Sequence, residues 1–541
     1  MPPPVMHDRP PLFRPAAGRG VGRLFSSVPP PMSPSTPSQT EAPSPAGRAG
    51  AGLWATDRSW LAWGALVVAC VGSRLATTIT YIEDPDSLRF ALSVAEEYDI
   101  AALQPHFPGY PVFWAAAELF YLPTGSFSAA FSIVGGLATA GIVWALLRLR
   151  GVALRSVEGV AIAGAVGLSP LVWLMGNRYM PDLLGTACAL AALALLVRAL
   201  PLGSNGPRRR LDERAALGGI VLTGLLTGLR LSYIPLVLAP ALWVLVRSRQ
   251  PGRLVGAGLA SVAVWLVPMI LDTGFWTLID VAWGQTTGHF TEFGGTVQTE
   301  PDLSRRVAGV VQGLWADGLG AWWPGRHPLT GVVGAGMLGL GGLGVWRLNR
   351  ERSCGGGQRV LVIGLCALLY GLWVFFFQNV VHKSRHVLPL LPLLLLLPAA
   401  GAAALWHLRS WVARAGVVGL AGAYAAVAIV LAVQHCSPSA IAQAKQFVER
   451  QAERPAPTRV ASVPLVNNYL RAQQVEARYL SIEDSADVRR LRKADAGQTL
   501  VVGTYASLLE ASPDSVRRFY HNPHVNRMWP KVTVYVYEHN R

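Results

Sequence analysis

Apolar stretches alternate with short polar segments from about residue 60 to residue 433. A helix needs about 20 mostly apolar residues to cross a bilayer, and several of these stretches are somewhat shorter. The eleven helices that we expect are 60–80, 127–147, 157–175, 181–198, 216–231, 232–247, 254–271, 328–347, 360–378, 386–407 and 412–433. The segment 109–122 is apolar but short, and we expect a helix that lies in the membrane interface. The pattern therefore predicts a mainly α fold, a polytopic transmembrane bundle of about eleven spans.

The chain becomes polar from about residue 437. Short β-branched and aromatic runs there predict strands, and longer stretches between them predict helices. We expect strands at Val460–Val463, Arg478–Ile482, Thr499–Tyr505 and Val532–Tyr537, with helices near 439–452 and 485–493. Residues 437–541 are thus predicted to form a small α/β domain.

The first 55 residues are rich in Pro, Ser, Gly and Ala with scattered Arg. Such a segment cannot bury enough apolar surface to order itself, so we expect a disordered cytoplasmic tail. A transit peptide or a misplaced start codon would also explain the Arg-rich, acid-poor character. The predicted division is a tail over 1–55, a membrane domain over 56–436 and a soluble domain over 437–541.

Composition supports the membrane class, because only 14% of the 541 residues are charged and 52% are hydrophobic. Ordinary soluble domains are about 25% charged. The net charge of +16 is spread over short loops and does not form one face, which argues against a nucleic-acid partner. The five cysteines form no metal-binding or disulfide framework, and no P-loop, HExxH or GxSxG motif indicates soluble hydrolysis.

Arginines indicate the orientation of the bundle, because positively charged loops stay in the cytoplasm. Four loops carry three to five arginines each: 148–156, 198–215, 247–253 and 347–359. With eleven spans, all four fall on the cytoplasmic side, the N-terminus lies inside and the C-terminal domain lies outside. The acidic segment after the first span, the turn 177–182, the loop 272–327 and the turn 379–386 then face outward together.

The acidic segment reads Glu83-Asp84-Pro85-Asp86-Ser87. Charges held against a bilayer are costly and usually have a function. Asp86 or Ser87 could equally cap a helix through Leu88–Tyr98, and the two roles are compatible. The element Gln104–Pro111 follows, with His106 held between prolines, and taken alone it favours a rigid turn with an exposed His106.

Two further outward turns carry charge. In Asn177-Arg178-Tyr179-Met180-Pro181-Asp182, Asp182 opens a membrane helix and could act with Asp86, or the turn could simply lie in the interface. His382-Lys383-Ser384-Arg385-His386 carries four basic residues where the positive-inside rule disfavours them, which favours a phosphate site. Arg230 could contribute similarly or snorkel to the interface. The tryptophans of the loop 272–327 could stack on sugars, although they also mark membrane interfaces.

Acidic and phosphate-binding groups on one membrane surface suggest sugar transfer from a polyprenyl-phosphate donor. The leaving group is already a phosphate and needs no proton, so one carboxylate base that deprotonates the acceptor hydroxyl is sufficient. Lipid-linked sugars are also the natural donors outside the cytoplasm.

At these residues the chain resembles the GT-C superfamily of membrane glycosyltransferases, of the protein O-mannosyltransferase or aminoarabinose transferase type. Glu83–Ser87 looks like their acidic motif, and Pro105–Pro111 is similar to the His-Pro-Pro-Gly-Tyr-Pro element of some bacterial members. Asn177–Asp182 looks like their second outer turn, and Arg385–Pro392 looks like their Arg-Tyr-Leu-Leu-Pro-Leu-Leu-Pro segment, with His386 where Tyr is frequent. The order matches across about residues 60–435.

The resemblance implies Asp86 or Asp84 as the base, with Asp182 as a supporting acid. It also implies Lys383 and Arg385 as phosphate contacts, with His106 near the sugar. The remaining expected substrate contacts are Glu83, Tyr110, Arg178, Arg230 and His386. Some relatives use a divalent metal, Mg or Mn, for which Asp84 and Asp86 would be the ligands.

The predicted function is an inverting hexosyl- or pentosyltransferase in the bacterial inner membrane, acting at its outer face among membrane lipids. The acceptor could be a lipid, a protein or a cell-envelope glycan. A transporter or flippase of lipid-linked sugar is the alternative, but such proteins usually show two related halves and polar groups near the midplane. A scaffold whose soluble domain binds partners is a third reading, against which the charged outer turns argue.

Overall fold

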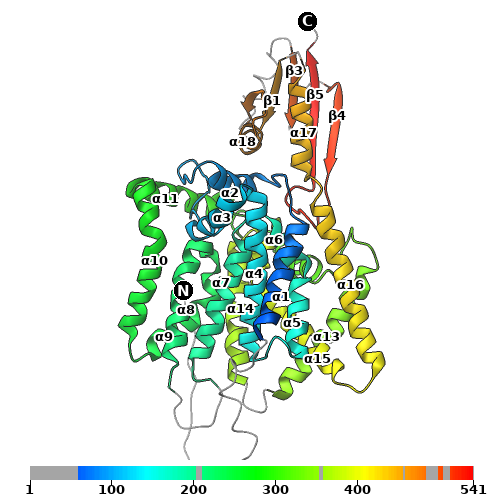
Figure 1. The fold of residues 1–541 in the computed structure, drawn as a ribbon. Coiled ribbons are helices and arrows are strands. Elements are labelled where there is room, and N and C mark those ends of the chain that lie inside the picture. Colours follow the sequence, from blue (N-terminus) through cyan, green and yellow to red (C-terminus); the bar gives the residue numbers. More distant parts are fainter. Residues whose placement is uncertain are drawn as a thin grey trace, which may run out of the picture. The chain divides into compact units, whose positions relative to one another are not determined.

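The computed structural model describes residues 59–202, 210–351, 357–454, 457–482, 497–503 and 512–539. The predicted tail over 1–55 and the predicted helix near 485–493 lie outside the described residues. Helices dominate the described part of the chain (Figure 1).

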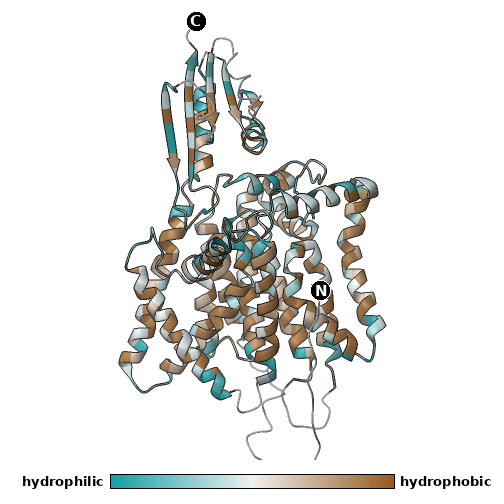
Figure 2. Cartoon of the chain, turned by 180° about the vertical axis from the view of Figure 1, so that it is seen from behind, coloured by the Kyte–Doolittle hydropathy of each residue, from teal (hydrophilic) through white to brown (hydrophobic). Residues whose placement is uncertain are grey.

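Apolar helices form a bundle in which every predicted stretch is helical (Figures 1 and 2). They are α1 (Ser59–Ala76), α4 (Phe127–Arg150), α5 (Val157–Gly167), α6 (Pro170–Asn177), α7 (Asp182–Ala199), α8 (Glu213–Arg230), α9 (Ile234–Arg247), α10 (Pro251–Thr273), α13 (Thr330–Glu351), α14 (Gly357–Phe377), α15 (Leu390–Trp406) and α16 (Trp411–His435). The predicted span 157–175 is bent by 56° between α5 and α6. Pro170 begins α6 there, because proline lacks the N–H group that a continuing helix requires.

Seven of the described helical stretches are long and apolar enough to cross a membrane, or eight if the bent pair is one span. This is fewer than the eleven stretches of the hydropathy pattern, because α1 and α15 are short apolar helices and Glu213–Arg247 counts as one stretch. However, Ser248 after α9 donates a hydrogen bond to Glu213 at the start of α8 (2.8 Å). The helices α8 and α9 therefore run antiparallel, as the sequence predicted.

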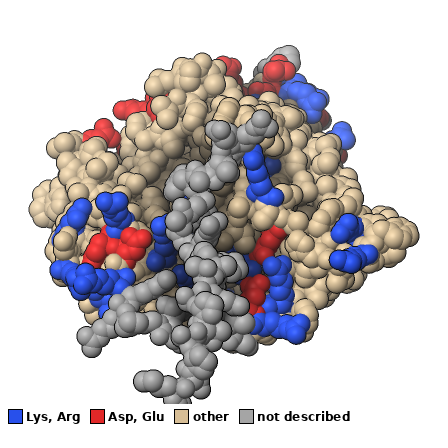
Figure 3. All heavy atoms as spheres, turned by 60° about the horizontal axis from the view of Figure 1, so that its bottom comes forward, with Lys and Arg blue, Asp and Glu red and all other residues tan. Residues whose placement is uncertain are grey.

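Two of the predicted cytoplasmic loops meet at one end of the bundle. Arg150 contacts Glu158 at 2.6 Å, and Arg347 contacts the same carboxylate at 3.0 Å. Arg150 also pairs with Glu351 at 3.2 Å. Figure 3 shows basic and acidic side chains around this end. These ion pairs place Arg150 and the end of α13 on one side of the bundle, as expected, while the side of the membrane stays a prediction.

Short elements cover the opposite end of the bundle (Figure 1). They are α2 (Pro85–Ala95), α3 (Pro111–Thr124), η2 (Leu231–Tyr233), α11 (Phe275–Thr291), α12 (Leu303–Val311), the π-helix η3 (Gln312–Gly318) and η5 (Ser384–Val387). The segment 272–327 was expected to be a loop, but α11, α12 and η3 make most of it helical. Its apolar positions are interrupted by polar residues, so the pattern shows no long hydrophobic run.

The start of α2 also differs from the prediction. Asp84, not Asp86 or Ser87, is the N-cap, and its carboxylate accepts a hydrogen bond from the Ser87 N–H group at 2.7 Å. Pro85 occupies the first helical turn, where its missing N–H costs nothing. The cap at Asp84 leaves Asp86 inside the first turn of the helix.

The C-terminal segment contains one mixed sheet with the order β2-β1-β3-β5-β4. Its elements are α17 (Ala440–Ala452), β1 (Thr458–Ser462), α18 (Pro464–Arg471), β2 (Arg478–Ser481), β3 (Gly497–Val502), β4 (Ser515–Tyr520) and β5 (Lys531–His539). β1 pairs in parallel with β2 and β3, while β5 pairs antiparallel with β3 and β4. The four predicted strands coincide with β1, β2, β3 and β5, although the end of the third, at Tyr505, lies outside the described residues. β4 was missed because its mostly exposed residues show no apolar alternation.

The C-terminal segment and the acidic segment share one hydrophobic core. Leu88 and Leu92 of α2 are buried in the same cluster as Val460 of β1 and Tyr469 of α18. Tyr469 also donates a hydrogen bond from its hydroxyl to the Ile82 carbonyl at 2.6 Å. The helix that carries Asp86 is therefore held by residues almost 400 positions later in the chain.

Candidate active site

Asp86 lies opposite the basic turn of the sequence. Its Oδ2 atom is 2.9 Å from Lys383 Nζ and 2.8 Å from Arg385 Nη2. Lys383 directly precedes η5 and Arg385 lies within it, so one tight turn presents both cations. All three side chains line a cavity of about 480 Å³. The structure thus brings together an acid and a basic turn that are about 300 positions apart in the sequence.

The cations control the protonation of Asp86. Burial alone would raise the pKa of this carboxyl, but Lys383 and Arg385 outweigh burial and hold its pKa well below the usual range. Burial in turn lowers the pKa of Lys383, against the attraction of Asp86. Asp86 is therefore an ionised carboxylate whose negative charge is neutralised by its two partners.

A second ion pair lies behind the same wall. Arg230 at the end of α8 pairs with Asp182 at the start of α7 at 3.0 Å, and it donates a hydrogen bond to the Tyr110 hydroxyl at 2.9 Å. Tyr110 is in turn 3.1 Å from His106 Nε2. Burial lowers the pKa of His106 to about 3, so its imidazole is neutral. Asp182 does not line the cavity, and it approaches Arg385 only at 4.0 Å.

Asp84 occupies a different position from Asp86. It caps α2 and lines a space of about 30 Å³ beneath residues 523–528, not the large cavity. Burial raises the pKa of Asp84, and the charges of Asp86 and Glu83 add to this rise. Of the two carboxylates that the sequence left as alternatives, only Asp86 faces the large cavity.

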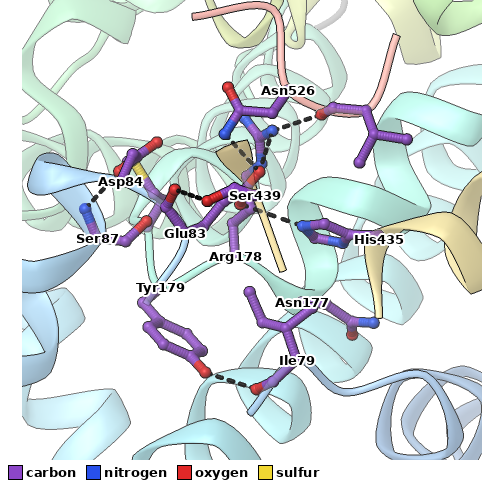
Figure 4. A network of polar contacts seen from close by, with 12 residues as sticks. Ile79, Glu83, Asp84, Ser87, Asn177, Arg178, Tyr179, His435, Ser439 and Asn526 are labelled. Atoms are coloured by element: carbon purple, nitrogen blue, oxygen red, sulfur yellow. Dashed lines mark hydrogen bonds and ion pairs between the residues drawn. The ribbon is translucent and has the colours of Figure 1, made fainter. Parts of the chain in front are cut away.

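Glu83 and Arg178 form an ion pair with each other, and neither lines the large cavity. Arg178 contacts Glu83 at 2.6 Å, while His435 and Asn526 contact the same carboxylate at 3.1 and 3.0 Å (Figure 4). Burial alone would raise the pKa of Glu83, but Arg178 and His435 lower it to about 2. Neither Glu83 nor Arg178 lines the large cavity, so their expected substrate contact has no support in this arrangement.

The carboxylates do not fit the metal that the resemblance suggested. A divalent ion takes several converging oxygen or nitrogen ligands. Over the described ranges, no group of three His, Cys, Asp or Glu side chains is placed to hold an ion. Asp86 is instead bound by two cations, and Asp84 is used as a helix cap.

Residues of the C-terminal segment reach the basic turn, which the sequence did not predict. His524 is 3.2 Å from Asp317 of η3, and Ser384 donates a hydrogen bond to the same carboxylate at 2.6 Å. Arg527 donates a hydrogen bond to the Val380 carbonyl at 3.2 Å. No local pattern could have signalled these contacts, because each depends on how distant segments meet.

The far wall of the cavity is also made of residues that the sequence analysis did not single out. Gln285, Thr286 and His289 of α11 line it together with Gln378 and Asn379, which follow α14. His386 of the basic turn also lines the cavity, and burial holds its pKa well below the usual range. The sequence analysis treated this segment as a loop, so it assigned no helical face on which Gln285, Thr286 and His289 could be grouped.

The long apolar helices of the described residues make this chain an integral multi-pass membrane protein. No family model matches the chain, and no curated protein matches it. Among solved structures, the chain is similar to ArnT from Cupriavidus metallidurans bound to undecaprenyl phosphate, with 13% identity, a TM-score of 0.45 and coverage of 88% of this chain and 98% of that one. It is also similar to the oligosaccharyltransferase AglB from Archaeoglobus fulgidus in complex with an inhibitory peptide and a dolichol-phosphate, with 11% identity, a TM-score of 0.43 and coverage of 82% and 69%.

Proposed function

We propose that this protein is a membrane glycosyltransferase that moves a sugar from a polyprenyl-phosphate donor to an acceptor hydroxyl. The observation that carries the proposal is the contact of Asp86 with Lys383 and Arg385 at the wall of the 480 Å³ cavity. A carboxylate and a pair of cations at one point are the groups that base-assisted displacement of a phosphate requires.

An apolar groove supports a lipid donor. It has a volume of about 380 Å³, lies between α9 and α14, and is lined by side chains such as Leu238, Leu242 and Phe376. Pro235 and Trp373 belong to both the groove and the large cavity, so the two spaces adjoin. An isoprenoid chain in the groove would place its phosphate in the cavity, where Lys383 and Arg385 can bind it.

The proposed reaction is a single displacement at the anomeric carbon. The acceptor oxygen forms a bond to this carbon while the bond from the carbon to the phosphate oxygen breaks. The bonding electron pair leaves with the polyprenyl phosphate, and Asp86 takes the proton of the acceptor hydroxyl. Because the acceptor attacks opposite the leaving group, the anomeric configuration inverts. Lys383 and Arg385 stabilise the negative charge that grows on the phosphate.

The same cations would make Asp86 a base only when donor is present. Without donor, Lys383 and Arg385 keep the pKa of Asp86 low, so it is a weak proton acceptor. A bound phosphate competes for both cations and adds a negative charge nearby, and both effects raise the pKa of Asp86. Donor binding thereby prepares the carboxylate for the acceptor.

The acceptor belongs to the class of lipids, proteins or cell-envelope glycans, and the transferred unit is a hexose or a pentose. The proposed location is the outer face of the bacterial inner membrane, with the N-terminus inside and the segment from about residue 437 outside. In this orientation the basic loops around Arg150 and Arg347 face the cytoplasm, as the positive-inside rule requires.

Turnover of a labelled donor tests the function. The purified protein in lipid nanodiscs is supplied with polyprenyl-phosphate sugar and an envelope extract as the acceptor source. We expect free polyprenyl phosphate to appear together with labelled acceptor. A transporter or flippase would leave the bond between sugar and phosphate intact, so an unchanged donor that merely crosses the bilayer would contradict the proposal.

Lys383→Gln and Arg385→Gln are each expected to weaken the binding of polyprenyl phosphate. A hydrogen bond to a charged group contributes about 1.5–3 kcal/mol, which corresponds to a roughly 10- to 100-fold higher Kd. The Kd of polyprenyl phosphate for the protein in nanodiscs is measured by the quenching of tryptophan fluorescence. Arg305→Gln is the matched control, because Arg305 is an exposed arginine of α12 that does not line the cavity. Equal Kd values for all three variants would place the phosphate elsewhere.

A further inference from the structure

Positive charge exceeds negative charge at the cavity wall. The formally charged side chains that line it, in the described part of the chain, are Arg89, Arg230, Lys383, Arg385 and Asp86. The carboxylate of Asp182 lies behind the wall and pairs with Arg230. Four cations thus face two carboxylates. A phosphodiester donor brings one negative charge and still leaves the site positive.

The histidines of the wall add hydrogen-bonding groups and no charge. Burial keeps the pKa of His106 near 3 and that of His386 well below the usual range. His289 lies with its Nε2 atom 3.1 Å from the Phe377 carbonyl, and burial lowers its pKa as well. The imidazoles are therefore neutral and do not add to the surplus of positive charge, but they can donate and accept hydrogen bonds.

Neutral polar side chains make up much of the wall beside the cations. His106, Ser232, Thr286 and His386 all line the cavity in the described part of the chain. The amides of Gln285, Gln378 and Asn379 extend the same neutral polar surface.

We infer that the donor sugar of this site is an uncharged, hydroxyl-rich sugar and not an amino sugar; this inference rests on the proposed function. Sugar hydroxyls both donate and accept hydrogen bonds, and the neutral imidazoles, hydroxyls and amides of the wall do the same. An ammonium group only donates, and it needs a carboxylate partner. Among the described residues, Asp86 is the carboxylate that lines the cavity, and in the proposed reaction it must stay free to take the acceptor proton, while Arg89 adds repulsion.

Three synthetic donors test this inference on the full-length protein in nanodiscs. They share one polyprenyl phosphate and differ at one position of the same hexose, which carries a hydroxyl, an amine or an N-acetyl group. We expect kcat/KM at pH 7 to be about tenfold or more higher for the hydroxyl donor than for the amine donor, because like charges repel in a partly desolvated site. The N-acetyl group is uncharged but larger than the amine, so this donor separates the effect of charge from the effect of size. Its kcat/KM should lie between those of the amine donor and the hydroxyl donor. Gln285→Glu adds a carboxylate to the wall. This variant should lower the ratio of kcat/KM for the hydroxyl donor to kcat/KM for the amine donor.

The outcomes separate the two proposals. Equal or better use of the amine donor, with release of polyprenyl phosphate, overturns the inference on the sugar and leaves glycosyl transfer intact. If the N-acetyl donor is used no better than the amine donor, charge repulsion is not the cause of the discrimination, and the inference is overturned as well. Turnover of none of the three donors overturns the inference on the sugar, and the release of polyprenyl phosphate in the assay with envelope extract then decides the proposed function separately.

Discussion

Asp86→Asn is expected to reduce sugar transfer by about 10²- to 10⁴-fold, the usual contribution of a positioned general base. The amide is nearly the same size as the carboxylate but cannot accept the proton of the acceptor hydroxyl. Binding of polyprenyl phosphate should stay equal or become tighter, because Lys383 and Arg385 lose their competing negative partner. Release of polyprenyl phosphate and the Kd of polyprenyl phosphate are the two readouts.

Asp84→Asn is the matched control for this variant. Asparagine caps a helix about as well as aspartate, so α2 should keep its start. Asp84 does not line the large cavity, and the control should therefore retain transfer within a fewfold of the wild type. Loss of transfer in Asp84→Asn with full activity in Asp86→Asn would reverse the proposed assignment of the base.

Glu83→Gln is expected to destabilise the protein by about 3–5 kcal/mol at pH 7, because it leaves Arg178 buried without its anionic partner. Thermal unfolding in detergent, followed by circular dichroism, measures the change in Tm. Glu351→Gln is the control, since Glu351 is largely exposed and its ion pairs with Arg150 and Arg347 should contribute less than about 1 kcal/mol.

The stabilisation by ionised Glu83 should also depend on pH in a defined direction. The pKa of Glu83 lies at about 2 in the folded protein, below its ordinary value of 4.5. Its stabilisation is therefore fully present above pH 4.5, and it is lost as the pH falls toward 2. The wild-type Tm should fall in this interval more steeply than the Tm of Glu83→Gln. Parallel curves for the two proteins would contradict the buried ion pair.

The sequence predicts the helices well, since long apolar runs leave no other backbone structure in a bilayer. It also places the acidic segment with Asp84 and Asp86 on the same side of the bundle as Lys383 and Arg385, and the structure brings Asp86 into contact with both cations. It does not distinguish Asp84 from Asp86, because that choice depends on which residue starts α2.

The sequence fails where a charge is satisfied by the protein itself. Glu83 and Arg178 have the residue types of substrate contacts, yet each is the partner of the other. Asn526 completes this pair from 443 positions away, and no local pattern reveals such a contact. The polar face of α11 was missed for a different reason. The tryptophans of this segment were interpreted as markers of a loop at the membrane interface, so no helix was predicted there.

The position of bound phosphate is the sharpest test of Lys383 and Arg385 as the phosphate-binding residues. A cryo-electron microscopy structure with polyprenyl phosphate should show the phosphate within hydrogen-bonding distance of Lys383 and Arg385, with the lipid tail between α9 and α14. Asp86 should then have released at least one of these cations. A phosphate bound at another surface, with the contacts of Asp86 unchanged, would contradict the account.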